Sequence, residues 1–224
     1  MATYYVSATT GAGSPDGLTA ATSYASVTAL MSGRTLAAGD VIFIAPGTYR
    51  EQIDCTAEGV SGTAANPIRW VGDPNCEHFP DIQPGVVRFS LADTKEEHKE
   101  DDTFATQMII DARNVAYHYF YNLYLDGGGA DLSDISTHQN FSGVYGNDKN
   151  NDFISVFNCM FQNLTKAAVT ITLAEDCAFI SNGYAGPYAV KYVERCIAIG
   201  GYYPMFNCEE IANSIGAGLA KATI

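Results

Sequence analysis

Two residue pairs in the sequence, each with at least one glutamate, have the residue types and the spacing for carboxylate chemistry. Glu175-Asp176 and Glu194-Arg195 occupy matching places, 19 residues apart. If the chain repeats with this period and stacks its repeats, Glu175 and Glu194 come to lie about 5 Å apart, the separation used by retaining glycosidases. Charges in turns are usually solvated, and Arg195 is available to neutralise these two. Glu175 and Glu194 are therefore the candidate catalytic residues, with a solvated turn as the alternative.

A second group of carboxylates has the chemistry of a Ca²⁺ site. Asp126, Asp131 and Asp134 lie on a glycine-rich stretch, and carboxylate oxygens are the ligands that Ca²⁺ prefers. Their spacing lacks the alternation of an EF-hand loop. The sequence favours ordinary loop polarity and predicts no cofactor, with Ca²⁺ at these three aspartates as the alternative.

The six cysteines include no C-x-x-C pair, which argues against a zinc site and against a redox motif. Cys159, Cys177 and Cys196 recur at nearly constant spacing. We predict that they form an inward stack of small apolar side chains. Disulfides between neighbouring repeats are the alternative.

The elements that must position these residues form a repeat. Cys159, Cys177, Cys196 and Ser214 follow one another at steps of 18, 19 and 18 residues, and the residue directly before each of them is polar. Residues that tolerate positive φ follow about four places later, at Asn163, Asn182, Gly200 and Gly218. The segment 114–125 aligns without a gap with 150–161, which places Leu123 in the cysteine position. The pattern predicts an all-β solenoid, a β-helix whose coils stack about 4.8 Å apart.

Strand periodicity assigns the faces of these coils. Residues two apart on a strand share a face, so the cysteine position and the position two later should both point into the core. The residues between them should then point outward, and they are mostly apolar: Tyr124, Met160, Ala178, Ile197 and Ile215. We predict that this stripe is an interface with another copy of the chain. The alternatives are that the stripe faces inward or that a loop covers it.

The N-terminal part of the sequence does not show this repeat. Residues 1–50 are expected to hold a short strand and a capping helix over 24–32 that lead into the first coil at Val41–Ile44, and residues 51–224 to hold the remaining coils. Ser23 is the expected N-cap and Gly33 the expected stop. Insertions are predicted near 73–105, where charges cluster, and near 128–149, which is either a long loop or an irregular coil.

The segments Ala38–Ile42, Ala45–Tyr49 and Asn66–Val71 read Ala-Gly-Asp-Val-Ile, Ala-Pro-Gly-Thr-Tyr and Asn-Pro-Ile-Arg-Trp-Val. This opening resembles that of right-handed parallel β-helices of the pectin-lyase-like family. The resemblance covers residues 1–72 best and 106–224 more loosely. It implies the fold; the family includes polysaccharide lyases, hydrolases, bacteriophage tailspikes and non-catalytic virion parts, so it implies no single activity.

Charge narrows the possible partners. The chain has 25 acidic and 12 basic residues and a formal net charge of −13, so nucleic acid and anionic membranes are poor electrostatic partners. No apolar run is long enough for a membrane span, and the first residues lack the features of a secretory signal. Neutral glycans or a protein surface fit better, and the 14 tyrosines offer rings that suit either.

From these patterns we expect a non-enzymatic structural or adhesive component of a bacteriophage virion or similar surface assembly, possibly one that binds glycans. A tailspike-like polysaccharide lyase or glycoside hydrolase is the first alternative, and a filament-forming cell-surface protein is the second. A homo-oligomer, most simply a trimer, is the expected state, with other virion or surface proteins at the C-terminal coil, which lacks a cap in the sequence. The expected location is a virion or extracellular surface.

Overall fold

The computed structural model of the protein describes residues 1–10, 14–57, 59–90, 108–128, 142–147 and 153–218. The helical segments within these ranges are a 3-10 turn at Ala20–Thr22 and α1 (Val27–Gly33). The strands are β1 (Thr3–Val6), β2 (Val41–Ile44), β3 (Gly47–Tyr49), β4 (Ile53–Asp54), β5 (Ile68–Gly72), β6 (Val87–Phe89), β7 (Met108–Asp111), β8 (His118–Tyr121), β9 (Tyr124–Asp126), β10 (Ser142–Tyr145), β11 (Ser155–Phe157), β12 (Met160–Gln162), β13 (Lys166–Val169), β14 (Leu173–Glu175), β15 (Ala178–Ile180), β16 (Ala185–Tyr188), β17 (Tyr192–Glu194), β18 (Ile197–Ile199), β19 (Glu210–Ala212) and β20 (Ile215–Ala217). No helix in these ranges is long and apolar enough to cross a membrane.

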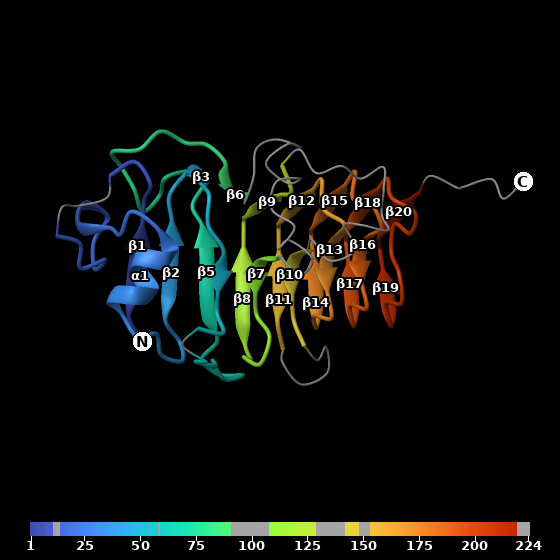
Figure 1. The fold of residues 1–224 in the computed structure, drawn as a ribbon, viewed down its shortest axis with the longest axis horizontal. Helices are drawn as coiled ribbons and strands as arrows, with labels where there is room; N and C mark the ends of the chain where they lie inside the picture. The colour runs from blue at the N-terminus through green and yellow to red at the C-terminus, as the bar shows by residue number, and fades with distance from the viewer. Residues whose placement is uncertain (11–13, 58, 91–107, 129–141, 148–152, 219–224) are drawn as a thin grey trace, which may run out of the picture.

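The strands form three sheets in which every pairing is parallel. The eight-stranded sheet has the order β1-β2-β5-β8-β11-β14-β17-β19, the seven-stranded sheet β20-β18-β15-β12-β9-β6-β3, and the five-stranded sheet β16-β13-β10-β7-β4. From β8 to β18 the chain visits the eight-, seven- and five-stranded sheets in turn. Between β18 and β19 the five-stranded sheet is continued only by isolated bridges at Tyr203 and Phe206. Figure 1 shows the result as an elongated molecule whose strands stack along its long axis, blue at one end and red at the other.

The register confirms the repeat. In the eight-stranded sheet Val156 pairs with Ala174 and Ala174 with Val193. In the seven-stranded sheet Phe161 pairs with Leu125 and with Phe179. The alignment of segment 114–125 with 150–161 is confirmed by the pairing of β8 with β11 and of β9 with β12.

The core is a set of side-chain ladders that run along the molecule. The inner residues of the seven-stranded sheet stack ring on ring: Phe161 and Phe179 lie 4.9 Å apart at 16°, and Tyr49 and Phe89 lie 4.9 Å apart at 18°. The inner positions of the eight-stranded sheet are almost fully buried from β2 to β17 and are occupied by Ile42, Trp70, Phe120, Val156, Ala174 and Val193. Parallel stacking therefore places apolar residues on apolar residues in successive coils.

The turn between the eight-stranded and seven-stranded sheets has one conformation in the five coils from β8 to β20. The residue before the cysteine position has positive φ at Asn122 (56°), Asn158 (49°), Asp176 (55°), Arg195 (51°) and Asn213 (51°). Asn and Asp tolerate this conformation best among non-glycine residues. The polar residue that precedes each cysteine position is thus explained by turn geometry.

The cysteine position is confirmed as part of the core. Cys159, Cys177 and Cys196 are at most 2% exposed, and all six thiols are free, so the disulfide alternative is wrong for this structure. Each buried thiol donates to the carbonyl two residues earlier, as Cys177 does to Glu175 at 3.2 Å. Ser214 repeats this contact with the carbonyl of Ala212. From Cys159 to Ser214 the position therefore takes a small side chain with a donor, whereas Leu123 fills it in the preceding coil.

The second predicted set of positive-φ residues is right in part. Asn163 (56°) and Gly200 (88°) have positive φ, but in the intervening coil Ser181 (52°) takes this conformation in place of Asn182. Asn182 is buried instead, where its side chain accepts from the Leu164 amide and donates to the Phe161 carbonyl. The Asn182 side chain thus replaces a backbone partner inside the turn.

The N-terminal helix begins three residues later than expected. Ser26, not Ser23, is the N-cap, and its hydroxyl accepts from the Ala29 amide. Tyr24 is drawn into sheet pairing instead, because its amide donates to the Tyr5 carbonyl and its carbonyl accepts from the Ser7 amide. Long-range strand pairing therefore overrides the local helix pattern at this point.

The two predicted insertions contain coil strands. β6 lies inside 73–105 and pairs with β3 and β9, and β10 lies inside 128–149 and pairs with β7 and β13. The irregular-coil alternative thus holds for 142–145. The charged run within 91–107 and the segment 129–141 lie outside the described residues.

Candidate functional site

The candidate catalytic pair lies where the sequence places it. Glu175 and Glu194 are register partners on β14 and β17. The guanidinium of Arg195 contacts the Glu175 carboxylate, donates to Glu194 at 2.5 Å and reaches Asp176 at 2.8 Å. Hydrogen bonds from Arg195 hold the pKa of the Asp176 carboxyl below its usual value, and the same contacts raise the pKa of Arg195. All three carboxylates are thus ion-paired with one arginine at the ends of β14 and β17, which agrees with the alternative to catalysis stated for these residues.

Asp126 is likewise fully engaged. It is buried, forms an ion pair with Arg88 at 2.8 Å, and accepts from the Tyr124 hydroxyl, the Asn163 amide and the Gly128 amide. Asp131 and Asp134 lie outside the described residues. Within the ranges that the structure covers, no group of three or more His, Cys, Asp or Glu side chains is arranged to hold a metal ion.

The other buried aspartates have structural partners too. Asp40 accepts from the Ala2 and Ala37 amides, and Asp73 accepts from the Glu77 and His78 amides. Asp111 binds the guanidinium of Arg113 with both oxygens, at 2.9 and 2.7 Å. These carboxylates close turns or pair with arginines, which leaves them poorly placed to act as general acids or bases.

The predicted interface stripe forms a single outward row. Tyr124, Met160, Ala178, Ile197 and Ile215 are successive register partners across the seven-stranded sheet. The same face changes character along the molecule. Near β9 it is polar, because the Tyr124 hydroxyl donates to Asp126 and lies 2.9 Å from the side-chain amide group of Gln162. Near β20 it is apolar, with Ile197, Ile199 and Ile215 between 46% and 64% exposed. The outward orientation is confirmed, and a second copy on this face stays a prediction.

Aromatic and cationic side chains meet along the five-stranded sheet. Tyr145, Val169 and Tyr188 are register partners on β10, β13 and β16, and Tyr188 forms a bridge to Phe206 in the next coil. The guanidinium of Arg113 lies 5.8 Å from the Tyr145 ring centre. These four residues come from successive coils, so they form a row along the long axis of the molecule.

The row ends in a cluster of four rings, Tyr184, Tyr188, Tyr203 and Phe206, which we call the tyrosine cluster. Tyr203 and Phe206 lie 4.7 Å apart, Tyr188 and Phe206 5.3 Å, and Tyr184 and Tyr203 5.4 Å. Tyr203 is 44% exposed. The cluster therefore presents both ring surface and hydroxyl groups to solvent.

Lys166 lies within this cluster. Its ammonium is 4.5 Å from the Tyr188 ring centre and 5.6 Å from that of Tyr184, and partial burial lowers the pKa of Lys166. It forms no ion pair with a carboxylate of the described residues. Its register partner Ser142 has a buried hydroxyl without a hydrogen-bond partner. A cation, hydroxyl groups and aromatic faces are thus close together, and these are the groups that bind sugars.

Comparison with known proteins agrees on the fold. No protein-family model matches the chain, and no curated protein matches it in sequence. Among solved structures, the GH136 lacto-N-biosidase from Eubacterium ramulus matches with a TM-score of 0.53 and 12% identity, over 97% of this chain and 55% of that one. The fold is a parallel β-helix.

Two further β-helix matches are weaker in superposition. A rhamnogalacturonan lyase matches at a TM-score of 0.48 and 16% identity, over 97% of this chain and 62% of that one. The pectin methylesterase from Aspergillus niger matches at 0.49 and 16%, over 93% of this chain and 66% of that one. This chain spans less than two thirds of each of these proteins.

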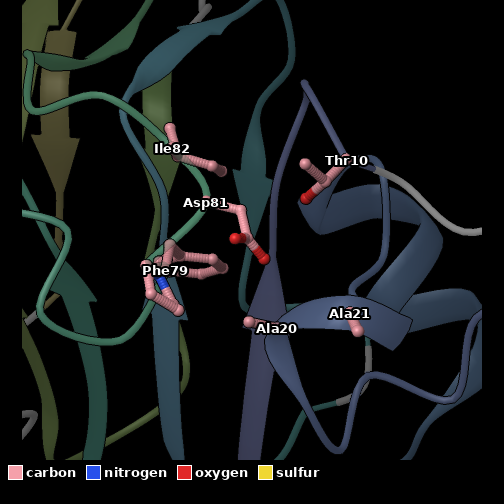
Figure 2. Close-up of a pocket in the computed structure, with 7 residues that line it drawn as sticks. Thr10, Ala20, Ala21, Phe79, Asp81 and Ile82 are labelled. Carbon is pink, nitrogen blue, oxygen red and sulfur yellow. The ribbon is translucent and has the colours of Figure 1, made fainter.

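The small pocket in Figure 2 is a minor feature of the β-helix. Phe79, Asp81 and Ile82 line one side, and Thr10, Ala20 and Ala21 line the other. Its volume is about 40 Å³, close to that of one or two water molecules. A wider, open groove near α1 includes Glu51, whose carboxylate accepts from the Val27 and Thr28 amides. Neither pocket gathers free catalytic groups.

Sequence reasoning found the tyrosines but not their grouping. It did not single out Lys166 or Phe206. The signal that could have found them is the repeat itself, since Lys166 and Ala185 occupy equivalent positions in adjacent coils.

Proposed function

We propose that this protein is a non-enzymatic, adhesive β-helix that binds a linear glycan along its five-stranded sheet. The observation that carries the proposal is the tyrosine cluster with the Lys166 ammonium over two of its rings. Aromatic faces stack on sugar rings, and an ammonium and phenol hydroxyls supply hydrogen bonds to sugar oxygens. The site is partly exposed and runs from one coil to the next, which suits a ligand with repeating units.

Binding is favoured over turnover by the state of the carboxylates. Hydrolysis of a glycoside needs a proton donor and a second carboxylate at a set distance. Glu175 and Glu194 are register partners on adjacent strands but share Arg195, and the buried aspartates hold turns or arginines. The matching lacto-N-biosidase is by its name a glycan-acting enzyme, which supports the ligand class. A polysaccharide lyase or hydrolase is the alternative.

The test is a screen of purified protein against neutral and charged oligosaccharides, with binding followed by calorimetry and products by reducing-end assay. Tyr188→Ala and Lys166→Met should each weaken binding of the selected glycan, by roughly tenfold for the lost ring contact. Tyr192→Ala is the matched control, since this tyrosine lies on another sheet. Failure to bind any glycan would refute the proposal, and measurable product would replace it with the enzymatic alternative.

A second candidate function, assembly, rests on the exposed isoleucines of the seven-stranded sheet. Ile215 is 64% exposed and Ile197 46%, on a face without charged residues from β15 to β20. Contiguous apolar surface of this kind is typical of protein interfaces. In this proposal copies pack through the face as a homo-oligomer, most simply a trimer, within a virion or extracellular surface assembly.

Mass measurement in solution tests the assembly. Replacing Met160 and Ile197 with Glu should convert the oligomer to a monomer with unchanged strand content. Thr48→Glu, on the polar end of the same outward row, should leave the mass unchanged. A wild-type monomer at high concentration, or an oligomer that survives the double substitution, would exclude this face as the interface.

We also propose that α1 caps the first coil of the solenoid. Val27 and Leu30 are fully buried in the main core, and Glu51 fixes the first turn of the helix. Leu30→Ala should then destabilise the fold by about 2–5 kcal/mol. Ser32→Ala, on the exposed side of α1, is the control, and equal melting temperatures of the two variants would contradict the capping role.

A further inference from the structure

The last coil that the structure describes, residues 202–217, leaves its core positions open; we call it the end coil. It keeps the register of the preceding coils, because Ile211 pairs with Val193 and Gly216 with Ala198. Val193 and Ala198 are each 1% exposed, whereas Ile211, at the corresponding core position, is 51% exposed. Figure 1 shows β19 and β20 at one end of the stack. The end coil is therefore folded like its neighbours but presents a cross-section of the core.

The backbone of β19 also has an open edge, because β19 is the last strand of the eight-stranded sheet. The Glu210 amide donates to the Lys191 carbonyl. The Ala212 carbonyl accepts from the Arg195 amide, so Glu210 and Ala212 turn their backbone groups toward β17. Backbone groups alternate sides along a strand, and the Ile211 amide and carbonyl therefore point away from β17. They are the donor and the acceptor with which a further strand would pair.

At the opposite end of the molecule the edge of the same sheet is covered. β1 is the first strand of this sheet. The Tyr5 amide donates to the Gly17 carbonyl, and the Ser7 amide donates to the Tyr24 carbonyl. Residues 17–24 thus lie along the outer side of β1. Head-to-tail association of copies, with β1 of one copy paired to β19 of the next, is blocked by this segment.

Charge argues against a second copy bound end coil to end coil. Residues 202–217 include Glu209 and Glu210 and no lysine, arginine or histidine. Glu210 is exposed and forms no ion pair within the described part of the chain. Two end coils in contact would bring glutamates from both copies together, and like charges on neighbouring strands are destabilising. The open edge therefore suits a partner strand that carries positive charge.

We propose that the end coil binds a β-strand of a different protein, which pairs in parallel with β19. The partner strand accepts from the Ile211 amide and donates to the Ile211 carbonyl. Register partners in parallel strands point to the same face, so an apolar side chain of the partner covers Ile211 and an adjacent lysine or arginine lies beside Glu210. This assigns a chemistry to the protein expected at the C-terminal coil. It requires neither glycan binding nor packing through the seven-stranded sheet.

Three short synthetic peptides, titrated against the full chain, test the partner strand. They share a central isoleucine and differ in the residues on both sides of it, which are lysine, threonine or glutamate. By fluorescence anisotropy the lysine peptide should bind roughly tenfold more tightly than the glutamate peptide. Glu210→Lys should reverse this order. Glu77→Lys is the matched control and should keep it, since Glu77 is an exposed glutamate in the loop between β5 and β6.

Hydrogen exchange distinguishes strand pairing from simple charge attraction. The lysine peptide should slow exchange of the Ile211 amide by roughly tenfold or more and leave the Tyr5 amide, at the covered end, unchanged. Ile211→Ser should weaken the lysine peptide while the melting temperature stays close to that of the wild type, because this side chain is half exposed.

Equal affinity for the lysine and glutamate peptides, no binding of any peptide, or unchanged exchange of the Ile211 amide would overturn the proposal. Exchange of that amide that slows as the concentration of the chain alone is raised would assign the edge to a second copy, and would overturn it as well.

Discussion

Glu175 and Glu194 are register partners on adjacent parallel strands, and a single arginine, Arg195, binds both carboxylates. Stacking of coils brings two like charges together, which is destabilising unless a cation lies between them. Arg195 supplies that cation from the turn of the second coil, where it also adopts a positive φ of 51°. The residue therefore combines a strained backbone with a charge that the stack requires.

Arg195→Gln should lower the melting temperature, because Glu175, Asp176 and Glu194 then repel one another. The loss should shrink in high salt, which screens exposed charges. Adding Glu194→Gln to this variant should recover part of the stability, as measured by thermal unfolding at low and high ionic strength. If the two salt conditions give the same loss, backbone effects and not charge explain the role of Arg195.

The thiols of the cysteine position should be protected from alkylation in the folded protein. Burial raises the pKa of Cys177 well above its ordinary value, and the thiolate is the reactive form. Cys208 is only half-buried, so at pH 8 it should react with iodoacetamide at least about tenfold faster than Cys177. Peptide mass mapping over time measures both rates. Equal alkylation rates would contradict the burial of the thiols at the cysteine position.

Gly143→Ala should destabilise the fold. A Cβ at Gly143 would lie 2.5 Å from the Ala167 carbonyl oxygen and 2.7 Å from the Phe161 ring, so backbone and ring must both move. We expect a loss of about 1–3 kcal/mol in the free energy of unfolding. Gly85→Ala is the control, since its new Cβ would meet only Pro46, at 3.4 Å. Denaturant titration of both variants measures the difference, and a similar loss for the two would refute the steric explanation.

His118 should make the protein acid-sensitive. Its Nδ1 accepts from the Trp70 indole, its Nε2 contacts the Val60 carbonyl at 2.8 Å, and burial lowers its pKa to about 4. Between this value and 6.5 the unfolded chain binds the proton and the folded chain does not. Stability contributed by neutral His118 is therefore lost as pH falls through that window, by roughly 3 kcal/mol at most.

The variant His118→Gln tests this prediction. It should unfold more easily at pH 7, because the contacts with Trp70 and Val60 change, but should lose less further stability between pH 6.5 and pH 4. His78→Gln serves as the comparison, since His78 lies at the surface loop beside Asp73. A variant whose pH profile parallels that of the wild type would show that His118 does not carry the effect.

Much of the β-helix could be predicted because its rules are local and repeat. The 18- to 19-residue spacing, the small residue at Cys159, Cys177 and Cys196, and the outward row from Tyr124 to Ile215 all follow from strand alternation and coil stacking. The same spacing placed Glu175 beside Glu194. Where a tertiary contact competes with a local pattern, prediction was wrong. Tyr24 pairs with β1 and leaves the helix, and Asn182 enters the core and leaves the positive-φ turn to Ser181.

The sequence by itself determined the period, the core positions and the sheet faces, because each depends on residues a fixed distance apart along the chain. Only the tertiary structure decided which side chains from different coils meet: Lys166 over Tyr184 and Tyr188, and Asp126 closed by Arg88. These contacts depend on rotamers and on insertions of unequal length between strands, and neither is encoded in a period.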